Sequence, residues 1–117
     1  MVEGPILVDT RMRSAASAEL DLVIPHDLRY FRGHFPGAPI VPGVVQIKWA
    51  VAFARELLRA GRGFAGMKAV KFLEVMQPGT AATLTLDYAA ASGELRFKFE
   101  SAGARYSNGT LLLRAAS

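Results

Sequence analysis

The chain contains no cysteine, so it can form neither a disulfide nor a metal site with thiolate ligands. It has two histidines, His26 and His34, and their spacing fits no zinc-binding pattern. We therefore expect no metal site and no bound cofactor.

The sequence also lacks a long hydrophobic run. No apolar stretch approaches the roughly 20 residues that span a bilayer, and Met1–Pro5 lack the basic and apolar regions of a signal peptide. We expect a cytoplasmic protein with no membrane span and one domain over residues 1–117. Hydrophobic residues make up 51% of the chain, which is slightly rich for a small monomer. Burial of apolar surface in an oligomer would explain this excess.

Positive charge exceeds negative charge, with 14 Lys and Arg against 10 Asp and Glu. A net charge of +4 is compatible with nucleic acid, an anionic membrane surface or an acidic protein partner. The basic residues form no run, and no aromatic-rich nucleic-acid motif accompanies them. We expect no nucleic-acid binding.

Hydrophobic periodicity predicts one long helix among strands. Residues 15–24 alternate as a strand does, and Val44–Leu58 are too long an apolar run for a strand. Alternation or apolar character predicts further strands at residues 67–75, 80–89, 95–100 and 110–114. Ser107-Asn108-Gly109 predicts a hairpin turn. The simplest architecture is an α+β fold in which a curved antiparallel sheet wraps around one long central helix.

The predicted helix is apolar around most of its circumference. Lys48, Arg55 and Arg59 fall in one narrow stripe near Val44 and Ala52 when residues are placed about 100° apart. A helix with such a wide apolar surface is buried on most sides, so we expect the sheet to cover it.

The segment Gly33–Val44 carries the strongest functional signal. Three prolines and three glycines surround His34 directly ahead of the helix, and the prolines restrict the backbone. A fixed imidazole titrates near neutral pH and suits a general base. The unpaired N–H groups at a helix start can polarise a carbonyl. A bystander histidine in a packed loop is the structural alternative.

This segment resembles the signature of the 3-hydroxyacyl-acyl-carrier-protein dehydratases of the FabA/FabZ type, which have the hotdog fold. The family pattern GHFPxxPxxPGVxxxE matches from Gly33 to Val44. Lys71-Phe72 and Pro78-Gly79 extend the similarity toward the C-terminus. The compact length and the sequence PGVVQIKWA are most similar to short FabZ-like dehydratases of aryl polyene and related polyketide-type clusters.

The resemblance implies dehydration of a 3-hydroxyacyl thioester on acyl carrier protein, in fatty acid or polyene-type biosynthesis. His34 matches the catalytic histidine, and Gly43 with the helix start matches the element that polarises the thioester carbonyl. Phe35 and Val44 belong to the same motif and are expected to contribute to substrate binding. Family members form hotdog dimers with two active sites at the subunit interface, so we expect a homodimer, a larger dimer-based oligomer, or a hetero-oligomer with another dehydratase.

Lys48 departs from the family pattern, because it stands where the family has a catalytic Glu or Asp. A lysine ammonium has an ordinary pKa of about 10.4 and is a poor acid at neutral pH. Three interpretations remain open. In the first, Lys48 is a catalytic residue made more acidic by burial. In the second, His34 performs both proton transfers. In the third, the chain is a weakly active or non-catalytic subunit that binds acyl thioesters. A structural alternative places Lys48 in the solvated stripe with Arg55 and Arg59. A hotdog thioesterase is a further alternative, in which water attacks the polarised thioester.

Overall fold

The computed structural model describes residues 3–28, 39–61 and 63–114. The elements follow in the order β1 (Ile6–Ser14), β2 (Ser17–Val23), α1 (Gly43–Leu58), β3 (Gly63–Phe72), β4 (Ala81–Ala89), β5 (Glu94–Ser101) and β6 (Ala104–Arg114). All pairings of the six strands are antiparallel, and the strand order in the sheet is β1-β2-β4-β5-β6-β3.

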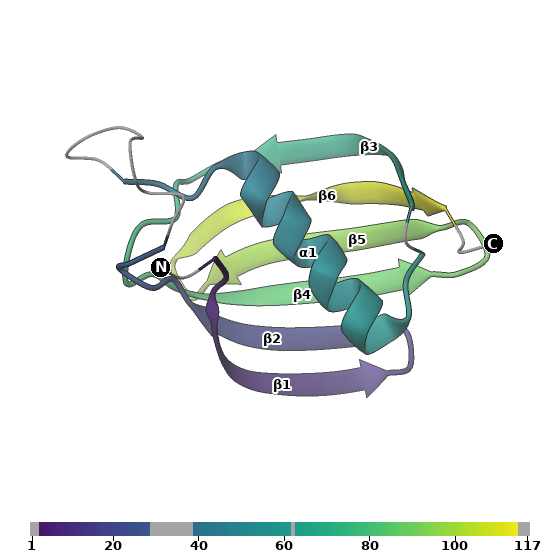
Figure 1. The fold of residues 1–117 in the computed structure, drawn as a ribbon, viewed down its shortest axis with the longest axis horizontal. Coiled ribbons are helices and arrows are strands. Elements are labelled where there is room, and N and C mark those ends of the chain that lie inside the picture. The colour runs from purple at the N-terminus through teal and green to yellow at the C-terminus, as the bar shows by residue number, and fades with distance from the viewer. Residues whose placement is uncertain (1–2, 29–38, 62, 115–117) are drawn as a thin grey trace.

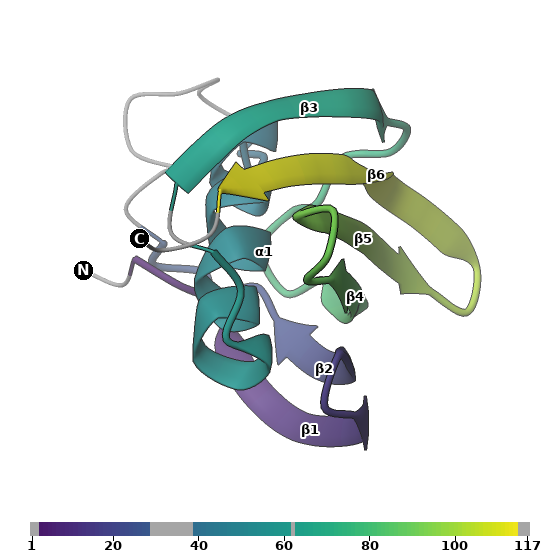
Figure 2. The same ribbon diagram turned by 90° about the vertical axis from the view of Figure 1, so that its right-hand side faces the viewer.

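The sheet curves around one face of the helix. Helix α1 crosses the strands diagonally (Figure 1), and the view from the side shows the strands bending around it (Figure 2). The predicted architecture of a curved antiparallel sheet around one long helix is confirmed. Strands β1 and β3 form the two edges of the sheet.

The core lies between the helix and the concave face of the sheet. Alternation predicted which side chains of the central strands face inward, and these side chains are buried, namely Ala82, Leu84, Leu86, Leu95, Phe97 and Phe99. From the helix, Trp49, Ala50 and Ala54 complete the contact. Burial of this apolar surface is the main force that holds the helix on the sheet.

The helix begins and ends close to the predicted limits. Pro42 is its N-cap, and the fixed φ of proline suits a helix entry. Its C-cap is Arg59, which has a left-handed backbone with φ of 54° in place of the glycine that usually takes this conformation. The N–H of the next residue, Ala60, donates to the carbonyl of Ala54 at 3.2 Å. Val44, Lys48, Ala52, Arg55 and Arg59 are all exposed, so the residues placed together by helical spacing lie on one exposed side of α1.

Three details of the strand prediction were wrong. Strand β1 was not predicted, because the sequence ILVDTRMRS shows no clear alternation. Strand β3 pairs with β6 and not with its sequence neighbour β4, and it covers Gly63–Phe72 in place of residues 67–75. Residues 107–109 form no turn and lie within β6. The turn between β5 and β6 is at residues 102–103.

Gly109 lies inside β6, where it allows close packing against β3 and does not form a turn. Strand β3 bulges between Lys68 and Lys71, and Ala69 has a φ of 53°. The bulge presses Val70 onto β6, so that a Cβ added at Gly109 would lie 2.6 Å from a Val70 methyl carbon. Glycine is therefore required there by close approach of the neighbouring strand.

A polar network on the sheet surface ties β1 to β2 and, through Thr83, β2 to β4. The Arg11 guanidinium donates two hydrogen bonds to the Asp21 carboxylate, at 2.7 and 3.0 Å, and Thr83 donates a third to Asp21 at 2.9 Å. The bonds from Arg11, and then that from Thr83, lower the pKa of Asp21 to about 2. Glu19 has a lowered pKa for the same kind of reason, chiefly because of its hydrogen bond from Arg13.

No helix in the described part of the chain is long and apolar enough to cross a membrane.

Candidate functional site

The first turn of α1 presents backbone donors without a carboxylate beside them. Pro42 offers no side-chain cap, and the N–H groups of Val45 and Gln46 donate to the Pro42 carbonyl at 3.0 and 3.2 Å. The first N–H groups of an α-helix have no acceptor within the helix. The first turn contains no acidic residue, so the partial positive charge of the helix start is left available to a polar or anionic group.

Phe72, at the end of β3, lies directly over this helix start. A Cβ added at Gly43 would stand 2.7 Å from the nearest ring carbon of Phe72, a separation that packed carbon atoms do not reach. Position 43 must therefore be glycine if the Phe72 ring keeps its place. The ring itself is half exposed, at 51%, so it walls the helix start on one side only.

The structure places three of the five predicted site residues. Gly43 is half-buried, Val44 is 73% exposed, and Lys48 is exposed one turn further along the same side of the helix. His34 and Phe35 lie outside the described residues. Their roles therefore stay predictions.

Two functional candidates were not predicted, and they lie behind the helix start. Gln46 and Ser107 are the buried polar side chains among residues 3–28, 39–61 and 63–114, at 3% and 1% exposed. The Ser107 hydroxyl donates to the Gln46 side-chain carbonyl at 2.7 Å, and the Gln46 amide donates to the Val41 carbonyl at 3.2 Å. The only sequence signal was a polar residue, Gln46, standing outside the exposed stripe of the helix.

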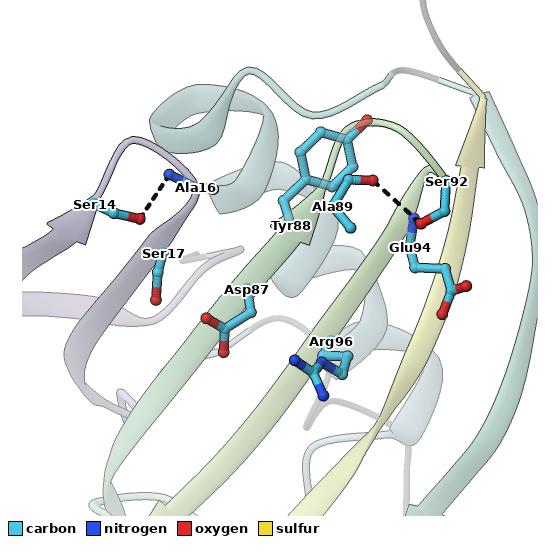
Figure 3. A pocket seen from close by; sticks show the side chains of 9 residues that line it. All are labelled: Ser14, Ala16, Ser17, Asp87, Tyr88, Ala89, Ser92, Glu94 and Arg96. Carbon is cyan, nitrogen blue, oxygen red and sulfur yellow. Dashed lines mark hydrogen bonds between the residues drawn. The ribbon is translucent and has the colours of Figure 1, made fainter.

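A separate open pocket lies at the other end of the helix and does not contain the predicted site. It has a volume of about 450 Å³ and is lined by Asp87, Tyr88, Arg96 and residues of the β1–β2 and β4–β5 turns (Figure 3). Tyr88 also accepts a hydrogen bond from the N–H of Gly61, just beyond the helix C-terminus. Since α1 has 16 residues, about 24 Å of helix separates this pocket from Gly43.

No group of three or more His, Cys, Asp or Glu side chains that could hold a metal ion occurs in the described part of the chain. At the helix start, the described groups are the backbone N–H groups of the first turn, Lys48 and the ring of Phe72.

Comparison with known proteins decides the family. A sequence model of the ApeI-like family, described as ApeI dehydratase, matches residues 10–110. The chain belongs to this family. The ApeI-like match covers β2, the helix, β3, β4 and β5 together with the predicted motif, so the resemblance to FabZ-type dehydratases seen in Gly33–Val44 is confirmed at the level of the family.

Solved structures agree with the ApeI-like assignment. The chain superposes on a chain of the dehydratase heterocomplex ApeI:P from Xenorhabdus doucetiae with a TM-score of 0.87 and 31% identity, covering 93% of this chain and 96% of that one. An uncharacterised protein from Erwinia carotovora subsp. atroseptica matches with a TM-score of 0.79 and 27% identity, covering 95% and 96%. The predicted hotdog fold is confirmed by the first of these likenesses.

Curated relatives carry the name 3-hydroxyacyl-[acyl-carrier-protein] dehydratase FabZ. The protein from Oenococcus oeni is 36% identical over 71% of this chain and 68% of its own length. The protein from Erythrobacter litoralis is 39% identical over 50% of this chain, and the match spans 45% of the relative. The ApeI-like chain thus spans between about half and two thirds of the length of these FabZ relatives.

Proposed function

We propose that this ApeI-like protein removes water from a 3-hydroxyacyl thioester on acyl carrier protein and yields the 2-enoyl thioester. The observation that carries the proposal is the family match over residues 10–110, which includes the Gly/Pro segment and the helix start. The helix start at Gly43, with no side-chain cap and no acidic residue in its first turn, supports the same role. Aryl polyene or related biosynthesis in the cytoplasm is the setting we propose.

Each step of the elimination has a candidate residue. His34 takes the C2 proton as general base, and the helix start at Gly43 stabilises the enolate oxygen that develops on the thioester carbonyl. The C3–O bond then breaks, and the hydroxyl leaves as water with the proton that the His34 imidazolium returns to it. Val44 and Phe35 are proposed to contact the acyl thioester, and an apolar tunnel takes the acyl chain.

Lys48 is proposed to assist His34 across a subunit interface. Lys48 and Val44 lie on the exposed side of α1, where a second copy of the chain can cover them. An ammonium near the partner subunit's His34 would favour the neutral imidazole, because two like charges disfavour each other. The neutral imidazole is the form that accepts a proton. The ammonium can also donate a hydrogen bond to the substrate hydroxyl.

A dimer is proposed because apolar side chains are exposed along β3 and at the helix start. Phe64, Met67 and Phe72 in β3 and Leu73 and Val75 just after it are each about half exposed, and Val44 is 73% exposed. An edge strand with exposed apolar side chains invites pairing with another chain. A hetero-oligomer with a second dehydratase is the alternative, supported by the ApeI:P complex formed by the Xenorhabdus doucetiae relative.

A product assay separates the proposed activity from its alternatives. The purified protein is incubated with 3-hydroxyacyl-acyl carrier protein, and the products are resolved by mass spectrometry. Loss of one water from the carrier-bound acyl group supports dehydration. Release of a free 3-hydroxy acid indicates a thioesterase. Unchanged substrate that nevertheless binds indicates a non-catalytic subunit and contradicts the proposal.

A further inference from the structure

A hydrogen-bonded chain of three groups connects the sheet to the segment before the helix. The Ser107 hydroxyl in β6 donates to the Gln46 side-chain carbonyl, and the Gln46 amide donates to the Val41 backbone carbonyl. Both polar side chains are buried. Every buried side-chain N or O atom of the described residues has a hydrogen-bond partner. The buried side-chain polar atoms of Gln46 and Ser107 therefore all have hydrogen-bond partners, and the two residues form an ordered polar network inside the core.

Val41 is held through both of its backbone polar groups. Its carbonyl accepts from Gln46 at 3.2 Å, while its N–H donates to the Met76 carbonyl at 2.9 Å. The residue itself is 3% exposed. Val41 directly precedes Pro42, whose carbonyl accepts from the N–H groups of the first helical turn. Fixing the Val41 carbonyl therefore fixes the orientation of the peptide from which the helix begins.

A polar side chain at position 46 is costly for packing alone. Burying an amide without partners is strongly unfavourable, and a satisfied hydrogen bond returns only a small net stabilisation. Methionine would fill a similar volume with no such requirement. What glutamine adds is a defined position for Val41, because a directional hydrogen bond holds a carbonyl where an apolar contact cannot.

We propose that Gln46 is a positioning residue, which aligns the first turn of α1 for polarisation of the thioester carbonyl. This inference rests on the proposed dehydratase activity. Stabilisation of a developing oxyanion depends on donors that are already in place, and a displacement of about 1 Å can lower a rate about a hundredfold. Gln46 acts through the backbone and does not itself touch the substrate.

Two buried variants separate positioning from stability. Gln46→Met removes the support of the Val41 carbonyl, whereas Ser107→Ala removes only the bond between the sheet and Gln46. Each leaves one or more buried groups unpaired, so both should lower stability. Gln77→Met serves as a control for glutamine replacement, because Gln77 is exposed in the turn after β3. Assays are run at a temperature where all variants are folded.

We expect Gln46→Met to lower kcat at least tenfold with KM changed less than about threefold, because the lost interaction acts on the transition state. Ser107→Ala should keep kcat within about threefold of the wild type, and Gln77→Met should match the wild type. If kcat falls equally in Gln46→Met and Ser107→Ala, turnover follows stability and the positioning role is overturned.

Hydrogen exchange gives a readout that needs no substrate. The amides of residues 45 and 46 donate to Pro42, so their exchange reports the order of the first turn. Relative to the Leu84 amide in the buried centre of β4, these two amides should exchange faster in Gln46→Met than in Ser107→Ala. Equal exchange in the two variants overturns the inference, even if the wild type proves inactive. A wild type that forms no enoyl product contradicts the proposed function, and the exchange comparison still decides the role of Gln46.

Discussion

The ring of Phe72 lies against Gly43, so that the end of an edge strand covers the start of the central helix. This contact joins the end of β3 and the start of α1 into one continuous surface, and Figure 1 shows these two ends next to each other. Val44, beside Gly43, is 73% exposed. An apolar surface of this kind at a helix start is unusual for a chain that acts alone.

We predict that the protein is a dimer that uses the β3 edge. Light scattering at micromolar concentration should give twice the chain mass of 12.6 kDa. Met67→Glu places a charge on β3, at a side chain that is 51% exposed, and should shift the mass toward the monomer. Val8→Glu makes the same kind of change on the opposite edge strand, β1, and should leave the dimer intact. A dimer that is lost in Val8→Glu and kept in Met67→Glu would place the interface on the wrong edge.

The second prediction concerns Lys48. Lys48→Ala should reduce turnover by more than tenfold, which corresponds to about 1.4 kcal/mol of transition-state stabilisation. Lys48→Glu restores the family pattern and should retain or raise activity. Lys98→Ala on β5 removes another exposed lysine and should leave turnover unchanged. If both Lys48 variants behave like the wild type, Lys48 belongs to the solvated stripe of α1. If an inactive wild type gains dehydration on Lys48→Glu, the binding-subunit interpretation is correct.

Much of this architecture could be predicted from the sequence, because it depends on local signals. Pro42 and the apolar run that follows fix the start of α1 to within one residue, and alternation identifies the inward faces of β4 and β5. Strand β1 could not be predicted because its sequence shows no alternation of apolar and polar residues. Its apolar residues are consecutive, and Ile6, Leu7 and Val8 are all exposed.

The features that could not be predicted depend on contacts distant in sequence. Ser107-Asn108-Gly109 reads as a turn locally, yet Gly109 is needed because Val70 of β3 approaches it. Gln46 finds its partner Ser107 across 61 residues of chain. Gly43 was predicted from the motif alone, but its contact with Phe72 depends on how β3 ends.

Stability in acid should depend on Asp21. Its pKa in the folded chain is about 2, against an ordinary value of 3.8, because Arg11 and then Thr83 donate hydrogen bonds to the carboxylate. The folded state therefore holds the proton less tightly than the unfolded state. The contribution of Asp21 is full above about pH 4 and is lost as the pH falls toward 2. Chemical unfolding between pH 5 and 2 should show a shallower pH dependence in Asp21→Asn than in the wild type. Equal slopes would contradict this account.

Docking of acyl carrier protein should weaken with salt. Arg59 at the end of α1 is exposed, and we propose that it contributes together with Arg32 and Arg62, which lie outside the described residues. Ion pairs at a surface are screened, with a Debye length of about 8 Å at 0.15 M salt. The Kd for the carrier, measured by calorimetry at low and high salt, should rise with salt, and Arg59→Gln should raise it at low salt. Arg96→Gln on β5 is the matched control. A Kd independent of salt would exclude electrostatic docking.

The central claim is dehydration that depends on His34, and one measurement tests it most directly. Enoyl-carrier formation is followed for the wild type, His34→Ala and His26→Ala, with circular dichroism confirming that each variant is folded. His26 is exposed and lies beside Gly79 in the turn before β4, so it serves as the matched control. We predict that His34→Ala abolishes turnover and that His26→Ala retains it. Turnover near the wild-type rate in His34→Ala would contradict the account.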